Sequence, residues 1–244
     1  MNFLALSTSF GEPAGHSHND YRQEIPLWTA LTNDFKSIEA DVFLRKDKLL
    51  VAHDAIELCE RKELTTLYLE PLKQYFSTRK FNGNSLILLI DVKSEALSSY
   101  RQIEETLKPY ESILTKFAGE KVLTNHVTVL ISGNRAINKM ERQRNRLAAL
   151  DGRLSNLEEG SSAILYPLIS QSWGSCFKWN GEGAMPEHEK KRLRQLVQKA
   201  HQNRQMIRFW GSPDVPECWK ELKAAGADLI NTDRVLELAR FLKK

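Results

Sequence analysis

The sequence predicts an α/β protein that folds as a closed (β/α)8 TIM barrel, and three observations support this fold class. Short apolar segments alternate with helical segments along the chain, which is the pattern of parallel βαβ units. The strands of this kind number about eight, as a barrel requires. The 244 residues, 41% of them hydrophobic, can bury one large core. We therefore expect one barrel domain over residues 1–244, with an irregular N-terminal segment at 1–14.

The first part of the chain shows this alternation most clearly. Pro26 begins an apolar-periodic stretch that predicts the first helix. A strand follows at Ser37–Leu44, and a turn then leads into a second short apolar run at Leu49–Ala52. We expect residues 57–76 to form a loop or lid over the barrel mouth, with a short helix at 71–76.

The strongest strand prediction is the continuous apolar run Leu86–Ile90, because a parallel strand that is covered on both faces needs no polar alternation. Helices and strands alternate after it to the end of the chain. The expected helices are 95–117, 136–146, 186–202, one around Trp219, and 235–242. The expected strands are 126–132, 147–151, 163–170, 206–210 and one within 224–233. In such a barrel, side chains at the C-terminal ends of the strands meet at one mouth.

Two acidic residues alternate in the strand predicted at Ser37–Leu44. Glu39 and Asp41 point to the same face of that strand, about 7 Å apart along it. Such a pair repels itself unless a cation lies between its members. Carboxylate oxygens suit Mg²⁺ or Ca²⁺. If the strand stood alone, a solvated edge strand with two surface acids would remain an alternative.

Histidine-bearing polar segments lie on either side of this strand. His16 and His18 belong to the turn-rich segment GHSHND, and His53 follows the apolar run at 49–52. Two imidazoles beside a two-acid cation site can act as acid and base in a hydrolysis, because histidine titrates near neutral pH. Each histidine taken alone is more often structural, so this hypothesis depends on the fold bringing them together.

A third carboxylate and a lysine follow the strand at Leu86–Ile90. Asp91 and Lys93 alternate with Val92, so both point to one side at the end of that strand. The residues themselves leave two interpretations open, a surface salt bridge and a further part of the cation site.

The motifs HSHNDY, IPLWTAL, SIEADVFL and LLVAHD resemble the phosphatidylinositol phospholipase C-like phosphodiesterase superfamily, which includes glycerophosphodiester phosphodiesterases and sphingomyelinase D-type enzymes. They are most similar to its bacterial and fungal branch related to "altered inheritance of mitochondria" proteins. The resemblance implies a barrel that hydrolyses phosphodiesters with one divalent cation. HNDY stands where glycerophosphodiester phosphodiesterases have His-Arg-Gly, and Asp91 where they commonly have Glu. The resemblance therefore does not specify a glycerophosphodiester substrate.

The resemblance also assigns roles to individual residues. It implies that His18 and His53 are catalytic, with His16 as the fallback, because Asn19 follows His18 directly as an asparagine follows shortly after the family's catalytic histidine. The implied ligands of one Mg²⁺ or Ca²⁺ ion are Glu39, Asp41 and Asp91. The expected substrate contacts are Lys93, Asn19, Trp210 and Trp173. Trp173 lies in an aromatic, glycine-rich segment of a kind that often shapes a pocket, although capping a core is the commoner role of a tryptophan.

Composition bounds the partners and the compartment. The net charge of +4 is spread among acids, which favours an anionic small ligand over nucleic acid. The three cysteines are far apart, which argues against a disulfide framework or a zinc site. No apolar stretch reaches the roughly 18 residues of a membrane span. We expect a soluble monomer, cytoplasmic as the sequence is written, or exported if a signal peptide was removed.

The leading hypothesis is a divalent-metal-dependent phosphoric diester hydrolase that acts on a phospholipid or glycerophosphodiester-like substrate. A barrel that binds a phospholipid or phosphometabolite without hydrolysing it is the alternative. A sugar-isomerase or aldolase barrel would use Lys93 as a Schiff-base lysine, but neighbouring acids raise the pKa of a lysine and oppose that role.

Overall fold

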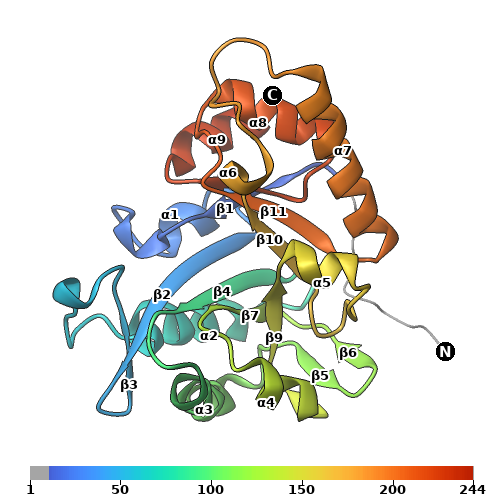
Figure 1. Cartoon of the computed structure of the whole chain (residues 1–244). Helices are drawn as coiled ribbons and strands as arrows, with labels where there is room; N and C mark the ends of the chain where they lie inside the picture. The colour runs from blue at the N-terminus through green and yellow to red at the C-terminus, as the bar shows by residue number, and fades with distance from the viewer. Residues whose placement is uncertain (1–10, 244) are drawn as a thin grey trace.

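The computed structural model describes residues 11–243, and a closed barrel is the centre of the fold (Figure 1). The main sheet has nine strands, and an additional pairing of β1 with β2 closes it. One of the nine, β3 (Lys48–Val51), runs antiparallel to β2, and the other eight are parallel. These eight, in their order around the barrel, are β1 (Ala14–Ser17), β12 (Leu229–Thr232), β11 (Met206–Trp210), β10 (Leu168–Ser172), β9 (Ala148–Gly152), β7 (Val127–Gly133), β4 (Leu86–Val92) and β2 (Ser37–Arg45).

The predicted (β/α)8 barrel is thus confirmed, and helices surround its strands (Figure 1). The helices are α1 (Trp28–Leu31), α2 (Glu70–Ser77), α3 (Ala96–Leu107), α4 (Ile137–Arg142), α5 (Leu154–Glu158), α6 (Trp173–Cys176), α7 (Glu187–Gln202), α8 (Pro216–Ala225) and α9 (Val235–Leu242). Of the segment expected to be irregular at 1–14, residues 1–10 lie outside the described residues, and Ala14 already belongs to β1. Among the helices described, none combines the length and apolarity needed to cross a bilayer.

The predicted helices at 95–117 and 136–146 are both too long. Helix α3 ends at Leu107 and continues as the 3₁₀ turn η4 (Lys108–Tyr110), where Pro109 cannot donate to the helical hydrogen-bond ladder. The remaining residues of both segments contribute to a separate antiparallel sheet. Its strands are β5 (Lys116–Ala118), β6 (Lys121–Leu123) and β8 (Asn145–Arg146).

The segment 57–76, expected as a loop or lid, is in large part packed against the barrel. A π-helical turn, η3 (Thr65–Leu69), runs directly into α2. Tyr68, Leu69 and Leu72 are fully buried there. Burying each such side chain contributes roughly 1.5–3 kcal/mol, so the second half of this segment is a fixed part of the fold.

Strand alternation divides the buried side chains into two groups. In β4, Leu88 and Ile90 belong to the large core cluster between the strands and the helices, whereas Ile87 and Leu89 belong to a smaller cluster inside the barrel. Leu130 of β7 joins that inner cluster. Nearer the C-terminal strand ends the inner positions become polar. The buried polar residues that lie toward these strand ends include His16, Glu39, Asp41, Ser132, Asp151, Ser170, Arg208 and Asn231. The barrel therefore has an apolar floor and a polar mouth.

Candidate active site

Three carboxylates converge at the mouth. Glu39 and Asp41 lie on β2, and Asp91 lies on β4, where the parallel pairing sets it directly beside Asp41. Each residue offers one oxygen, and these oxygens all lie within 4.8 Å of one another. Glu39 is 4% exposed and Asp41 is 0% exposed, so water screens their repulsion little.

The electrostatics of this cluster fit a bound divalent cation. Burial raises the pKa of Asp91 to about 6, with Glu39 and Asp41 acting in the same direction and Lys93 opposing them. Among the described residues, the buried Oδ1 atom of Asp41 has no hydrogen-bond partner. A cation among these oxygens would stabilise the charged form of Asp91 and would give Oδ1 of Asp41 a partner. An all-oxygen donor set suits Mg²⁺ or Ca²⁺.

Lys93 lies just after β4 and points into the same cluster. Its Nζ is 3.2 Å from Oδ2 of Asp41 and 3.3 Å from Oδ1 of Asp91. Burial would lower the pKa of Lys93, but Asp91 and Asp41 outweigh it and raise that pKa. The lysine is therefore a fixed positive charge, which suits a phosphate oxygen and opposes a Schiff-base role.

The two histidines predicted to be catalytic lie on either side of the carboxylates. Nδ1 of His53 is 2.9 Å from Oδ2 of Asp41, and Nδ1 of His18 is 2.8 Å from Oδ1 of Asp233. Nε2 of His18 is 3.8 Å from Oε1 of Glu39. Burial would lower the pKa of His18, but Asp233 and Glu39 outweigh it and raise that pKa. When Nδ1 donates to a carboxylate, Nε2 remains available to a substrate.

His16, the fallback for His18, is placed differently. It is fully buried, with Nδ1 2.7 Å from Oγ of Ser37 and Nε2 2.9 Å from Oε2 of Glu39. The guanidinium of Arg208 also contacts Nε2. Burial and Arg208 lower the pKa of His16 to about 4, against the opposing effect of Glu39. A neutral imidazole with both nitrogens in contact is suited to positioning Glu39.

Arg208, on β11, was not found from the sequence. Its Nη1 donates to Oε2 of Glu39 at 2.7 Å and to Oδ1 of Asn231 at 3.1 Å, and its Nε donates to Oγ of Ser170 at 3.2 Å. Burial would raise the pKa of Glu39, but Arg208 outweighs it and holds that pKa below its usual range. One signal was present, since Arg208 alternates with Trp210 and so shares its inward face.

A second chain of contacts connects the first loop to the carboxylates. Oη of Tyr21 lies 2.8 Å from Oδ1 of Asn19 and 2.9 Å from Oδ2 of Asp41. Nδ2 of Asn19 lies 3.2 Å from Nδ1 of His18. Asn19 has a left-handed backbone (φ 45°), which asparagine tolerates better than most residues. Asn19 was predicted to contact substrate. It is only 7% exposed, and its side chain contacts His18 instead. Tyr21 was missed, although it belongs to the HNDY motif.

The two tryptophans expected to contact substrate differ in exposure. Trp210 ends β11 and is 43% exposed, so it can contact a ligand at the rim. Trp173 is 3% exposed, packs against Phe177 with ring centroids 4.3 Å apart, and donates from Nε1 to the carbonyl of Trp179. The expectation for Trp173 is therefore corrected, because it caps the core behind the mouth.

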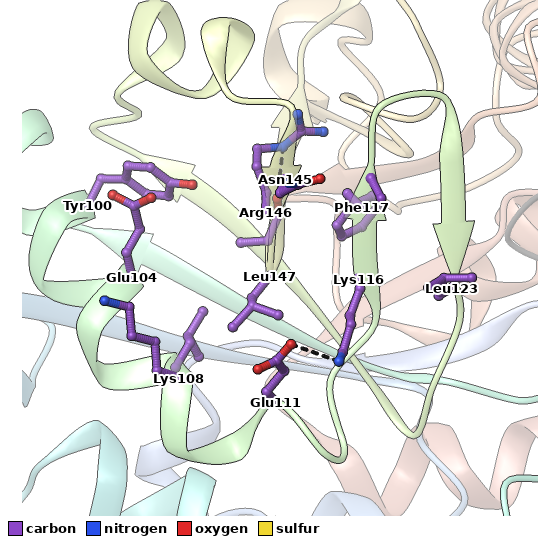
Figure 2. A pocket seen from close by; sticks show the side chains of 13 residues that line it. Tyr100, Glu104, Lys108, Glu111, Lys116, Phe117, Leu123, Asn145, Arg146 and Leu147 are labelled. Carbon is purple, nitrogen blue, oxygen red and sulfur yellow. Dashed lines mark hydrogen bonds and ion pairs between the residues drawn. The ribbon is translucent and has the colours of Figure 1, made fainter.

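A groove outside the mouth carries charged side chains, but among the described residues no carboxylate that lines it is buried. The groove has a volume of about 390 Å³. It lies between α3 and the three-stranded sheet (Figure 2). Its lining includes Tyr100, Leu107, Phe117, Leu123 and Leu147. Ala148, at the start of β9, also lines it, so the groove lies at the end of that strand opposite Asp151.

The closed barrel and the carboxylates at its mouth define a (β/α)8 barrel with a candidate metal centre at the C-terminal ends of its strands. Two solved structures share the fold. A glycerophosphodiester phosphodiesterase from Parabacteroides distasonis matches with a TM-score of 0.56 and 15% identity, over 95% of this chain and 97% of that one. One from Agrobacterium tumefaciens matches with a TM-score of 0.57 and 11% identity, over 95% and 100%.

The sequence comparisons identify the family within that class. Residues 12–82 match the model of the AIM6-like phosphodiesterase domain. The chain is 30% identical to the altered inheritance of mitochondria protein 6 homolog of Arthroderma benhamiae, over 90% of this chain and 81% of that protein. It is 26% identical to altered inheritance of mitochondria protein 6 of Eremothecium gossypii, over 93% and 68%. The chain belongs to the family of altered inheritance of mitochondria protein 6, as the motifs of its first 95 residues predicted.

Proposed function

We propose that this chain is a divalent-metal-dependent phosphoric diester hydrolase. One observation carries the proposal. The oxygens of Glu39, Asp41 and Asp91 lie within 4.8 Å of one another, and His18 and His53 stand beside them with Nδ1 of each held by a carboxylate. Such an arrangement combines a cation site with two groups that can move protons.

The mechanism assigns a task to each side chain. Glu39, Asp41 and Asp91 would hold one Mg²⁺ or Ca²⁺ ion, which when bound neutralises the phosphate and stabilises charge in the transition state. Lys93 holds a phosphate oxygen as a point charge. One of His18 and His53 takes the proton of the attacking hydroxyl, from water or from the substrate, through its Nε2. The other gives a proton to the leaving alkoxide as the phosphorus–oxygen bond breaks.

The rim suggests the kind of alcohol that the phosphate carries. Trp210 presents an exposed aromatic face at the end of β11, and such a face packs well against an acyl or glyceryl group. A phospholipid or glycerophosphodiester-like substrate fits this rim.

The test uses bis(p-nitrophenyl) phosphate with Mg²⁺, with Ca²⁺ and with a chelator. Turnover should require a cation, and His53→Ala and Glu39→Gln should each reduce it strongly. The matched controls are His188→Ala and Glu158→Gln, because both of these residues are exposed helix positions outside the set of residues that form the candidate site. Both controls should retain wild-type turnover.

Calorimetric titration with Mg²⁺ and Ca²⁺ separates binding from chemistry. Glu39→Gln should lose cation binding, whereas His53→Ala should retain it. Absence of turnover with every cation, together with retained phospholipid binding, would overturn the proposal in favour of the non-hydrolytic barrel.

A further inference from the structure

A second polar cluster lies at the mouth beside the carboxylates. The register pairs Asp91 of β4 with Ser132 of β7, and Oγ of Ser132 lies 2.8 Å from Oδ2 of Asp151 on the next strand, β9. Adjacent strands are about 5 Å apart, so the backbone of Asp151 lies roughly 10 Å from that of Asp91. A substrate whose phosphate lies at the carboxylates could therefore place another of its groups, a few bonds from the phosphorus, at this cluster.

Positive charge exceeds negative charge in this cluster. Nη1 of Arg153 donates to Oδ2 of Asp151 at 2.8 Å, and Nη1 of Arg135 donates to the main-chain carbonyl of Asp151 at 2.6 Å. Ser132 donates from Oγ to the same carboxylate at 2.8 Å, and Nη2 of Arg153 lies 3.3 Å from that hydroxyl. Two guanidinium groups thus surround one carboxylate.

The cluster is also incompletely hydrogen-bonded. In the part of the chain that the structure describes, the buried Nε of Arg135 has no hydrogen-bond partner, so this donor is open to an acceptor such as the oxygen of an anion. Asp151 is 0% exposed, so bulk water does not reach its carboxylate. Buried polar atoms of native proteins nearly always have partners, and each one left without costs about 1–3 kcal/mol. The side chain of Arg153, 29% exposed, connects these groups to the open mouth.

We propose that Arg135 and Arg153 form a subsite for a second anionic group, a phosphate or a carboxylate, on the alcohol part of the phosphodiester substrate. The inference rests on the proposed function and narrows its substrate class to diesters that carry a further anion. Guanidinium groups suit this role because their planar donors match two oxygens of such an anion. Ser132 and Asp151 hold Arg153 in place for it.

The competing interpretation is purely structural, since both arginines also donate to main-chain carbonyls of residues 151–152. Substrate selectivity separates the two. The experiment measures kcat/KM for bis(p-nitrophenyl) phosphate and for a p-nitrophenyl diester whose second alcohol carries a phosphate monoester.

In Arg153→Gln, the preference for the substrate with the second anion should fall at least tenfold. Arg153→Lys keeps the charge near Asp151 and loses the planar donors, so it should lie between wild type and Arg153→Gln. Arg194→Gln, an exposed position on α7, is the control and should leave the preference unchanged. Equal loss on both substrates in the two Arg153 variants would overturn the subsite.

A binding measurement keeps this test separate from catalysis. Inorganic pyrophosphate is titrated into the metal-free protein in the presence of a chelator, and its affinity should fall at least tenfold in Arg153→Gln and in Arg135→Gln. If wild type hydrolyses no diester but binds pyrophosphate in this arginine-dependent way, the proposed function fails and the anion subsite stands. If diesters are hydrolysed and pyrophosphate affinity is the same in all variants, the subsite fails and the hydrolase stands.

Discussion

The barrel mouth and the groove of Figure 2 both carry charged side chains, but the two regions arrange them differently. In the groove, Lys116 pairs with Glu111 at 2.7 Å, and both side chains are exposed. At the mouth, Glu39 and Asp41 are almost completely buried and face Asp91 at close range. The groove pairs opposite charges in water, whereas the mouth concentrates like charges out of water.

This difference distinguishes the candidate site from an ordinary charged surface. Exposed ion pairs contribute about 0–1 kcal/mol, so the groove can hold its charges without any ligand. Buried like charges destabilise the fold unless something compensates them, and here Lys93 compensates Asp91 only in part, because the pKa of Asp91 stays raised. Charge convergence, and not the volume of the groove, is therefore the basis on which the mouth is chosen as the candidate site.

The largest expected effect is on the rate of diester hydrolysis. His53→Ala should lower kcat about 10²–10⁴-fold, because a positioned acid or base contributes that much. In the groove, Tyr100→Phe removes one hydroxyl, which donates to Gln143, and should leave kcat unchanged. A comparable loss in both variants would break the contrast between the two regions. Thermal melts should show that both variants remain folded.

Arg208 tests the energetic side of the comparison. Arg208→Met removes the buried partner of Glu39 and leaves that carboxylate uncompensated, which should lower the free energy of unfolding by about 3–5 kcal/mol. Lys116→Gln removes an exposed partner in the groove and should cost less than about 1 kcal/mol. Urea denaturation of both variants measures the two values. Similar values for both would mean that the ion pair at the mouth is as weak as the one in the groove.

Gly133 tests how closely the mouth is packed. Its φ is +64°, and an added Cβ would lie 2.1 Å from Oδ1 of Asp91, so Gly133→Ala should displace that carboxylate. We expect Mg²⁺ or Ca²⁺ affinity to fall at least tenfold, measured by calorimetry. Gly160→Ala is the matched control, because Gly160 has a φ of +67° with open space around it. It should reproduce the backbone strain of about 1 kcal/mol and leave cation affinity unchanged.

The smallest effect is expected at the rim of the groove. Leu123 is 58% exposed, so Leu123→Gln should change the free energy of unfolding by no more than about 0.5 kcal/mol. Diester hydrolysis should keep its wild-type rate. A clear loss of activity in this variant would show that the groove takes part in substrate binding and would overturn the contrast.

The fold was predictable where the local pattern is strong. The strand at 206–210 and the helix at 235–242 have the predicted bounds, and the apolar run at 86–90 lies within β4. The small sheet of β5, β6 and β8 was missed because its strands are two or three residues long. Runs so short show no alternation that distinguishes them from the ends of the neighbouring helices.

The site was predictable where a motif carries it. Glu39, Asp41 and Asp91, with His18 and His53, lie together as the resemblance implied, and their roles stay predictions. No pattern within one segment of the sequence indicated that Arg208 contacts Glu39 or that Trp173 is buried in the core. Both depend on how the closed barrel brings distant segments together.

By itself, the sequence determined the chemistry that is available: oxygen donors alternating on one strand, imidazoles beside strand ends, and a lysine two residues after an acid. The tertiary structure alone decided that His18 is accessible while His16 is buried against Glu39. It also set His18 beside Asp233, 215 residues away, and Arg208 beside Glu39, 169 residues away. The physical reason is that the hydrogen-bond register of a closed sheet sets these distances, and no pattern within one segment contains that register.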